Sequence, residues 1–388
     1  MEDPNILPDV SHVSDKHCAK QFTEKTRRKL PALCLGTVGI ALLTQVLASA
    51  ARPSMKQSMP SGRVVPALSP YVDAHVHIDE HDPEGSVNAA LQAMSELNAA
   101  RVFVLTEPYS PDDRNRWDVE SILPALKIYP NKLAVLGGGG TLNAMIQESV
   151  RSGDAGADIQ TKFKERAEEM VREGVAGFGE MTTEHFSLAA SPLKDYEYAP
   201  ADSPLMLLLA DIAAQKNIPI DLHMEAAPHT IPLPHGLESP PNPSHIHGNI
   251  AALERLLDHN RRAKIIWAHA GSDNTGYRTP ELCDRLLRAH PNLYMEIKID
   301  PMYPGRNYPM ADGKIKPAWI KLLQKHPDRF IIGSDQHYGP ELTATHSRAQ
   351  ATVLFLNQLP TELRTRIGME NVEHIYGGAP SAESGGQR

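Results

Sequence analysis

Eight short apolar or β-branched runs alternate with longer stretches of helical periodicity, and this alternation constrains the fold more than any other feature of the sequence. Strands separated by helices cannot pair through tight hairpins, so neighbouring strands are expected to run parallel. Eight such units over residues 71–377 predict a (β/α)8 TIM barrel that forms a single catalytic domain. The predicted strands are Tyr71–Ile78, Arg101–Thr106, Lys132–Leu136, Val175–Glu180, Ile218–His223, Lys264–His269, Asn292–Ile297 and Arg329–Ser334.

An open, doubly wound sheet is the alternative architecture for such an alternation. That fold normally carries a glycine-rich phosphate-binding turn after its first strand, and no such turn follows Ile78. The four glycines at 137–140 lack the Lys-Ser/Thr of a P-loop, so they indicate a tight loop. Helices are predicted at Val87–Ala99, Ala157–Glu173, Leu205–Lys216, Asn249–Asn260, Pro280–Ala289 and Ile315–Lys325.

Residues 1–50 predict an export signal rather than a folded domain. A basic cluster at 25–29 precedes an uncharged stretch, and Ala48-Ser49-Ala50 supplies a small-residue cleavage pattern. The segment Thr26–Leu30 resembles a twin-arginine export motif, which predicts a periplasmic protein. An uncleaved membrane anchor is the alternative, because an uncharged run of about 20 residues can span a bilayer. Once the signal is removed, no stable membrane span is expected.

The remaining organisation is simple. Residues 51–70 are rich in Pro and Ser and predict a linker, residues 71–377 form the barrel, and 378–388 predict a flexible tail. Lys and Arg total 39 against 47 Asp and Glu, so the net charge of −8 provides no bulk attraction for nucleic acid. The expected partner is a small-molecule substrate, with homo-oligomer formation left open. Three cysteines exclude a disulfide-dense scaffold and a Cys-based zinc ribbon.

Ligand-type side chains collect where the predicted strands end. In a TIM barrel the loops after the strands converge on one mouth, where the chemistry takes place. His75 and His77 are two apart in the first strand and project to the same side. Imidazole and carboxylate groups suit Zn most, while Mn, Fe or Co accept the same donors. The candidate metal ligands are His75, His77, Glu180, His223, His269 and Asp335.

This pattern resembles the amidohydrolase superfamily of metal-dependent barrels over nearly the whole barrel domain. The resemblance implies that His75 and His77 bind the more buried metal, and that His223 and His269 bind a second or shared metal. It also implies that Asp335 is both a ligand and the catalytic base, which takes a proton from metal-activated water.

The fourth strand bears on the number of metal ions. Many members of the superfamily carry a carboxylated lysine there that bridges two metals, and this chain has Glu180 instead. Some branches use glutamate for that bridge, so one or two ions are compatible with the sequence. The branch that this chain resembles most includes single-zinc decarboxylases, which usually lack a carboxylate ligand at this position. Glu180 therefore favours hydrolysis.

The function expected from these residues is hydrolysis of a C–N or C–O bond, in an amide, ester or lactone, by metal-activated water. A single-metal nonoxidative decarboxylase of an aromatic or related carboxylic acid is the alternative, and a non-enzymatic metal or ligand binder is a remote third. Asp221 is a candidate to orient a ligand histidine, or else a polar residue of the barrel interior. Weaker candidates for substrate binding, each balanced against an ordinary solvated loop charge, are Glu225, Arg278, Lys298 and His337.

Overall fold

The structure is a computed structural model of the 388-residue chain, and it describes residues 64–188, 196–339 and 346–377. The predicted export signal, residues 51–63 of the predicted linker and the predicted tail lie outside the described residues and remain predictions. The end of that linker, residues 64–70, is irregular but hydrogen-bonded to a helix of the barrel. The backbone N–H of Val65 donates to the Gln350 side chain at 3.0 Å, and that of Leu68 donates to Asn357 at 2.8 Å.

Eight parallel strand positions form a closed ring in chain order. The eighth position holds two short strands, of which β13 pairs with β10 and β14 pairs with β1. This closure confirms the (β/α)8 barrel and excludes the open, doubly wound sheet. The ring consists of β1 (Tyr71–Ile78), β2 (Ala99–Leu105), β3 (Leu133–Gly138), β4 (Gly177–His185), β6 (Ile220–Met224), β9 (Ile265–Ala270), β10 (Leu293–Ile297), β13 (Phe330–Ile332) and β14 (Gln336–Tyr338).

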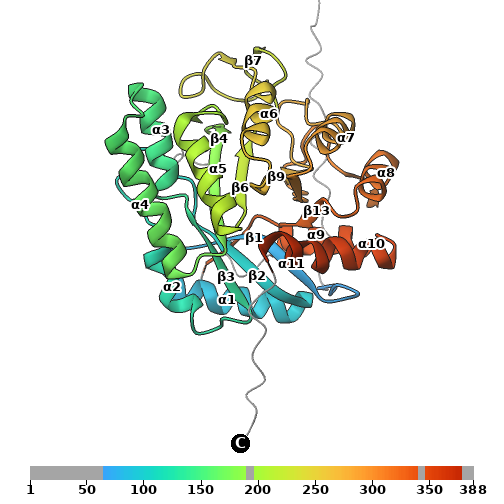
Figure 1. Ribbon diagram of the computed structural model, residues 1–388. Coiled ribbons are helices and arrows are strands. Elements are labelled where there is room, and N and C mark those ends of the chain that lie inside the picture. The colour runs from blue at the N-terminus through green and yellow to red at the C-terminus, as the bar shows by residue number, and fades with distance from the viewer. Residues whose placement is uncertain (1–63, 189–195, 340–345, 378–388) are drawn as a thin grey trace, which may run out of the picture. The chain divides into compact units, whose positions relative to one another are not determined.

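Helices surround the strands on the outside of the ring (Figure 1). They follow the strands along the chain, as a right-handed βαβ succession requires. The helices are α1 (Pro83–Leu97), α2 (Val119–Leu126), α3 (Leu142–Ser152), α4 (Ala157–Glu173), α5 (Pro204–Lys216), α6 (Ile250–His259), α7 (Pro280–Ala289), α8 (Pro317–Lys325), α9 (Ser347–Leu356), α10 (Thr361–Thr365), the π-helical turn η1 (Arg366–Glu370) and α11 (Asn371–Tyr376).

Local sequence signals explain where several of these elements begin and end. At α7, Pro280 occupies the first turn, and the Thr279 hydroxyl accepts a hydrogen bond from the backbone N–H of Leu282 at 3.2 Å. Helix α4 ends at Gly174, whose φ of 101° is a left-handed conformation that glycine adopts without strain. The bounds of β1, α4 and α7 are those predicted from the sequence.

The structure adds α2, α3, α9, α10 and α11 to the predicted helices, and β4 continues five residues beyond Glu180. The extension is paired, because Glu184 and His185 lie opposite the antiparallel strand β5 (Glu197–Tyr198). Two further pairs of short antiparallel strands lie in the loops after β6 and β10. They are β7 (Ile231–Pro232) with β8 (His245–Ile246), and β11 (Met310–Ala311) with β12 (Lys314–Ile315).

Two hydrophobic clusters hold the barrel together. The larger one packs the helices against the outer faces of the strands and includes the fully buried Trp267, Phe178 and Trp319. A smaller cluster joins residues of six strands, among them Phe103 and Ile266, to residues of α11. Burial of side chains of this size contributes roughly 1.5–3 kcal/mol each. The strand ends are therefore fixed by a well-packed scaffold.

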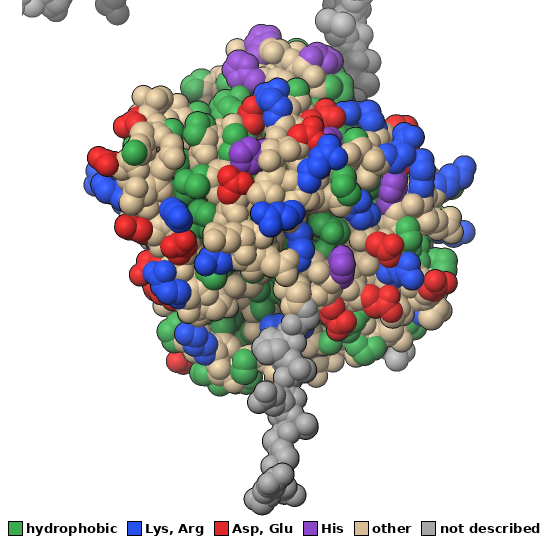
Figure 2. Space-filling model, viewed as in Figure 1, with side chains coloured by type: hydrophobic (Ala, Val, Ile, Leu, Met, Phe, Trp, Pro, Cys, Tyr) green, Lys and Arg blue, Asp and Glu red, His purple; other side chains and the backbone are tan. Residues whose placement is uncertain are grey.

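The face shown in Figure 2 carries acidic and basic side chains interspersed with one another. It presents no extended basic surface of the kind that nucleic-acid binding requires. Within the described parts of the chain, no helix combines the length and the apolar character needed to cross a membrane.

Candidate metal centre

The structure brings the six predicted ligands together at the carboxyl-terminal ends of the barrel strands. His75 and His77 lie on β1, Glu180 on β4, His223 on β6 and His269 on β9, while Asp335 lies between β13 and β14. Five of the six are buried, and the side chain of His223 is 15% exposed. Because parallel strands end at one rim of the barrel, residues far apart in the chain meet there.

Glu180 lies at the centre of this group, between two pairs of histidines. Its Oε1 is 2.8 Å from Nδ1 of His223 and 3.0 Å from Nε2 of His269. Its Oε2 is 3.7 Å from Nε2 of His75 and 3.5 Å from Nε2 of His77. One carboxylate therefore presents one oxygen to each imidazole pair, an arrangement suited to a ligand shared by two ions.

Asp335 lies beside the His75–His77 pair and is held by two cations. Its Oδ1 is 3.3 Å from Nε2 of His77. Its Oδ2 accepts hydrogen bonds from Nζ of Lys298 and, at 3.1 Å, from Nη1 of Arg348. Arg348 is itself anchored through Nε to Asp300 at 2.8 Å. With Oδ2 engaged, Oδ1 is the oxygen that faces the histidines.

The backbone at two of the ligands is in the left-handed region. The φ values are 63° at His269 and 53° at Asp335, where a side chain with a Cβ costs roughly 1–3 kcal/mol of strain. His269 is the penultimate residue of β9, and Asp335 lies in the short segment between β13 and β14. Strain of this kind clusters at functional sites, and its presence at two candidate ligands supports a functional role for this rim.

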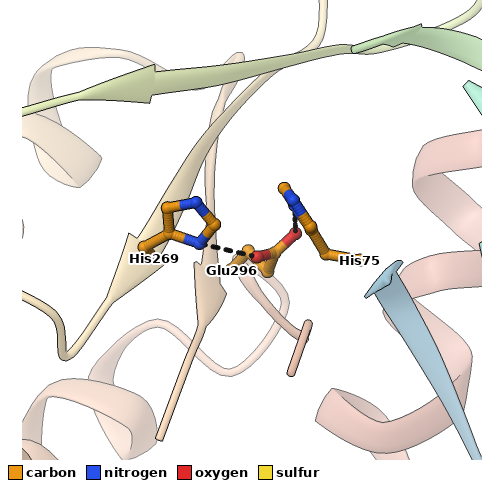
Figure 3. Close-up of side chains that lie close together, drawn as sticks. All are labelled: His75, His269 and Glu296. Atoms are coloured by element: carbon orange, nitrogen blue, oxygen red, sulfur yellow. Dashed lines mark hydrogen bonds and ion pairs between the residues drawn. The ribbon is translucent and has the colours of Figure 1, made fainter. Parts of the chain in front are cut away.

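Two buried carboxylates lie behind the histidines. Oε2 of Glu296, on β10, is 3.1 Å from Nδ1 of His75, and its Oε1 is 3.5 Å from Nδ1 of His269. Figure 3 shows Glu296 between these two rings. Asp221, on β6, is also near, with Oδ1 3.5 Å from Nδ1 of His75. Asp221 therefore lies where the sequence predicted a partner for a ligand histidine.

Electrostatics follow from these contacts. Burial alone would raise the pKa of Glu180, but the four histidines hold it well below its usual value. The same competition, with Lys298 and Arg348 prevailing over burial, holds the pKa of Asp335 well below its usual value. His77 shows the reverse, since burial would lower its pKa but Asp335 and Glu180 raise it to about 9. The rim is thus a set of ionised carboxylates facing imidazoles.

The weaker candidates for substrate binding occupy different places. Lys298 contacts Asp335, and the ring of His337 lies 4.7 Å from that of His77, so both stand at the rim. Glu225 is buried and accepts a hydrogen bond from Nδ2 of Asn274 at 2.6 Å. None of these contacts tests whether Lys298, His337 or Glu225 binds a substrate, so that role stays a prediction.

Arg278 lies apart from the other candidates. Its guanidinium stacks over Trp267 at 4.0 Å and donates to the backbone carbonyls of Trp267, at 2.7 Å, and of Ala268. It is 3% exposed. Its contacts are therefore with the wall of the barrel and not with the metal ligands.

Two residues of the centre were missed by sequence reasoning. Glu296 interrupts the apolar run of the seventh predicted strand, and a lone acidic residue inside a buried strand was a usable signal. Arg348 lies on α9, thirteen positions beyond Asp335, and no strand register points to it. Helix residues reach the mouth through loop geometry that periodicity does not encode.

The donor set fits a divalent metal ion. Imidazole nitrogens and carboxylate oxygens of His75, His77 and Glu180 lie within 4.8 Å of one another, as do those of Glu180, His223 and His269. Nε2 of His75 and Nε2 of His77 are 3.1 Å apart, a separation that two ligands of one ion at about 2.0–2.1 Å can have. Nitrogen and oxygen donors in such groups are the preferred ligands of zinc.

Comparisons with known proteins give the following similarities. A dihydroorotase from Saccharomyces cerevisiae in complex with 5-fluoroorotic acid superposes at 12% identity and a TM-score of 0.44, covering 80% of this chain and 84% of that chain. A dihydroorotase from Campylobacter jejuni has 16% sequence identity and a TM-score of 0.44, and the match covers 82% of this chain and 86% of that chain. Amidohydrolase 2 from Bifidobacterium longum subsp. infantis has 13% sequence identity and a TM-score of 0.41, and the match covers 79% of this chain and 98% of that chain. No family model matches the sequence, and no curated protein matches it significantly.

Proposed function

We propose that the protein is a metal-dependent hydrolase of the amidohydrolase type, which cleaves a C–N or C–O bond of a small molecule. The observation that carries the proposal is the position of Glu180, with one carboxylate oxygen toward His223 and His269 and the other toward His75 and His77. Two ligand groups that share one carboxylate favour two ions over one. Two adjacent ions are typical of hydrolytic metal sites, where they lie about 3.5–4 Å apart.

The ligands divide into a buried and a more open group. His75, His77 and Asp335 would hold the more buried ion, while His223 and His269 would hold the second and Glu180 would serve both. A divalent ion bound here supplies Lewis acidity and lowers the pKa of a coordinated water toward neutrality. We propose zinc as the natural ion, because all donors are nitrogen or oxygen and the ligand cage is rich in histidine.

Asp335 is suited to the proton transfer that hydrolysis requires. Lys298 and Arg348 keep its Oδ2 engaged, so Oδ1, which faces His77, is the atom that would accept a proton from the water and then deliver it to the leaving group. Its low pKa keeps it in the acceptor form at neutral pH. The contacts with Lys298 and Arg348 fix the direction of this carboxylate and reduce the reorganisation needed during the reaction.

The proposal is tested by metal analysis combined with a substrate screen. Protein purified without added metal is analysed for bound ions, then loaded with Zn²⁺ and assayed against lactones, amides and esters. We expect about two ions per chain and release of a carboxylic acid from one of these classes. The variant Asp211→Asn, at the exposed surface beside His259, is the matched control and should retain both ions and activity.

The alternatives give different results in the same experiment. One ion per chain together with release of carbon dioxide from an aromatic acid would overturn hydrolysis in favour of decarboxylation. Stoichiometric metal with no turnover of any class in the screen would support a binding protein instead. Absence of bound metal, both before and after loading, would contradict the proposed metal centre.

A further inference from the structure

We propose that Glu296 is a positioning residue of the metal centre, which fixes the imidazoles of His75 and His269 so that both Nε2 atoms point to the metal. The inference rests on the proposed function, since it presumes that the rim binds divalent ions. It extends that proposal to a carboxylate on β10 whose donor atoms lie within 4.8 Å of those of His75 and His269. Its role follows from its contacts with the Nδ1 atoms of these two histidines, whose Nε2 atoms face Glu180.

The geometry places one carboxylate behind two ligands. The rings of His75 and His269 are 4.8 Å apart, and Glu296 lies between their Nδ1 atoms (Figure 3). Oε2 is 3.1 Å from Nδ1 of His75, and Oε1 is 3.5 Å from Nδ1 of His269. A histidine that donates its Nδ1–H to a carboxylate has its other nitrogen, Nε2, deprotonated and available as a metal ligand. One side chain therefore sets the tautomer of His75 through a hydrogen bond, and its other oxygen lies within ion-pair distance of Nδ1 of His269.

A second observation shows that the barrel reserves space for Glu296. Gly333 lies on the neighbouring eighth strand, and a Cβ at that position would lie 2.1 Å from Cδ and 2.4 Å from Oε1 of Glu296. Its φ is not in the left-handed region, so the backbone does not require glycine there. The requirement is steric. Any larger residue at 333 must displace the carboxylate, which is fully buried.

Asp221 is the competing partner for His75, and the distances favour Glu296. Asp221 Oδ1 is 3.5 Å from Nδ1 of His75, and neither of its oxygens accepts a hydrogen bond from the described residues. Glu296 is nearer to His75 by 0.4 Å, the difference between 3.5 and 3.1 Å. It is also the carboxylate that reaches His269. Asp221 thus contributes negative charge near His75, while Glu296 makes the directed contact.

The test compares the affinity for Zn²⁺ of wild-type protein and Glu296→Gln, by competition with a chromophoric chelator. Glutamine keeps the volume but has one acceptor oxygen for two N–H groups, so one ring loses its partner. We expect Zn²⁺ affinity to fall by about 10- to 100-fold. We also expect the visible absorption of the Co²⁺-loaded protein to change, because a rotated imidazole alters the ligand field. A purely structural role of Glu296 would not move that spectrum in folded protein.

Two further variants provide an independent test and a control. Gly333→Ala should reproduce the loss of affinity and the spectral change by displacing Glu296 without removing it, so the test survives if Glu296→Gln fails to fold. Glu184→Gln removes another buried carboxylate of the barrel, one that contacts Tyr196, and should leave both readouts unchanged.

The outcomes separate this inference from the proposed function. Wild-type affinity and spectrum in both Glu296→Gln and Gly333→Ala would overturn the positioning role and leave the hydrolase proposal standing. Tight binding that weakens as expected, in a protein without hydrolytic activity, would support the positioning role and count against the hydrolase. A wild-type protein that binds neither Zn²⁺ nor Co²⁺ would contradict both.

Discussion

Glu180 and Asp335 are both ionised carboxylates at the rim, but their surroundings give them different tasks. Glu180 is contacted by histidines on both oxygens and, within the described part of the chain, by no lysine or arginine, so both of its oxygens face imidazoles. Asp335 gives one oxygen to Lys298 and Arg348 and keeps one toward His77. The first arrangement favours bridging, and the second favours a carboxylate that exchanges a proton.

The division of tasks predicts the effect of Asp335→Asn. An amide can still contact metal or histidine through its oxygen, but it cannot accept a proton, so we expect the fold and most bound metal to be retained. Turnover should fall by about 10²- to 10⁴-fold, the usual contribution of general acid–base catalysis. Steady-state kinetics and metal analysis of the same preparation check the prediction. An active Asn variant with wild-type turnover would show that the proton is accepted elsewhere.

A second prediction concerns Arg278, whose contacts with Trp267 and Ala268 indicate a role in stability. Lysine in its place lacks the planar guanidinium that stacks over Trp267 and the fixed fork of N–H groups that reaches both carbonyls. We expect Arg278→Lys to lower the free energy of unfolding by roughly 2–4 kcal/mol, because buried carbonyls lose their donors. Urea denaturation measures this loss. Unchanged stability combined with a raised KM would instead restore the predicted role in substrate binding.

At the level of elements, the barrel could be predicted because local signals and long-range pairing agree. The strand β1 is apolar and β-branched, and α7 carries its cap and proline where the periodicity begins. Prediction failed at the end of β4, because the continuation beyond Glu180 depends on pairing with β5, about a dozen residues later. An antiparallel contact made by two residues leaves almost no signal in composition or periodicity.

The same distinction applies to the metal centre. His75 and Asp335 could be placed at one rim because each stands at a strand end, and the parallel register brings strand ends together. The hydrogen bond from Arg348 to Asp335 could not be predicted, since Arg348 reaches Asp335 from helix α9. The role of Glu296 depends on the missing side chain at Gly333, a relation between two strands that neither strand reveals alone.

The β4 extension carries a prediction about pH. Burial raises the pKa of Glu184 to about 7, although the Tyr196 hydroxyl donates to it at 2.6 Å. A raised pKa means that the folded protein holds this proton more tightly than the unfolded chain. The stabilisation is therefore complete below pH of about 4.5 and is lost as the pH rises through about 7. The free energy of unfolding that this proton contributes is on the order of 3 kcal/mol.

The variant Glu184→Gln should remove that dependence, because an amide does not titrate. We expect the difference in unfolding free energy between pH 5 and pH 8 to become smaller than in the wild type, with the variant relatively more stable at pH 8. Urea titrations at the two pH values provide the measurement. Glu169→Gln, at the exposed face of α4, is the control and should follow the wild-type trend. Parallel trends for all three proteins would contradict the assigned titration.

At the level of the whole molecule, the two proposed ions together would link ligands from five separate strand positions of the barrel. Because the unfolded chain cannot assemble them, binding stabilises the fold, by about 2.7 kcal/mol when free metal is 100 times the Kd. We expect the Tm to fall on treatment with a chelator and to recover with Zn²⁺. The double variant His75→Ala/His77→Ala should have a Tm that responds much less to either treatment. An equal response in that variant would show that the stabilising ion binds elsewhere.

Closure of the ring between β14 and β1 has a consequence for biosynthesis. The first and last strands of the barrel are about 260 positions apart, the span from Val76 to Gln336, yet they lie side by side. During translation, the edge of β1 that pairs with β14 stays unpaired until residues 336–338 have left the ribosome. Since Asp335 directly precedes β14, the proposed ligand set is complete only when the first and last strands of the barrel have met.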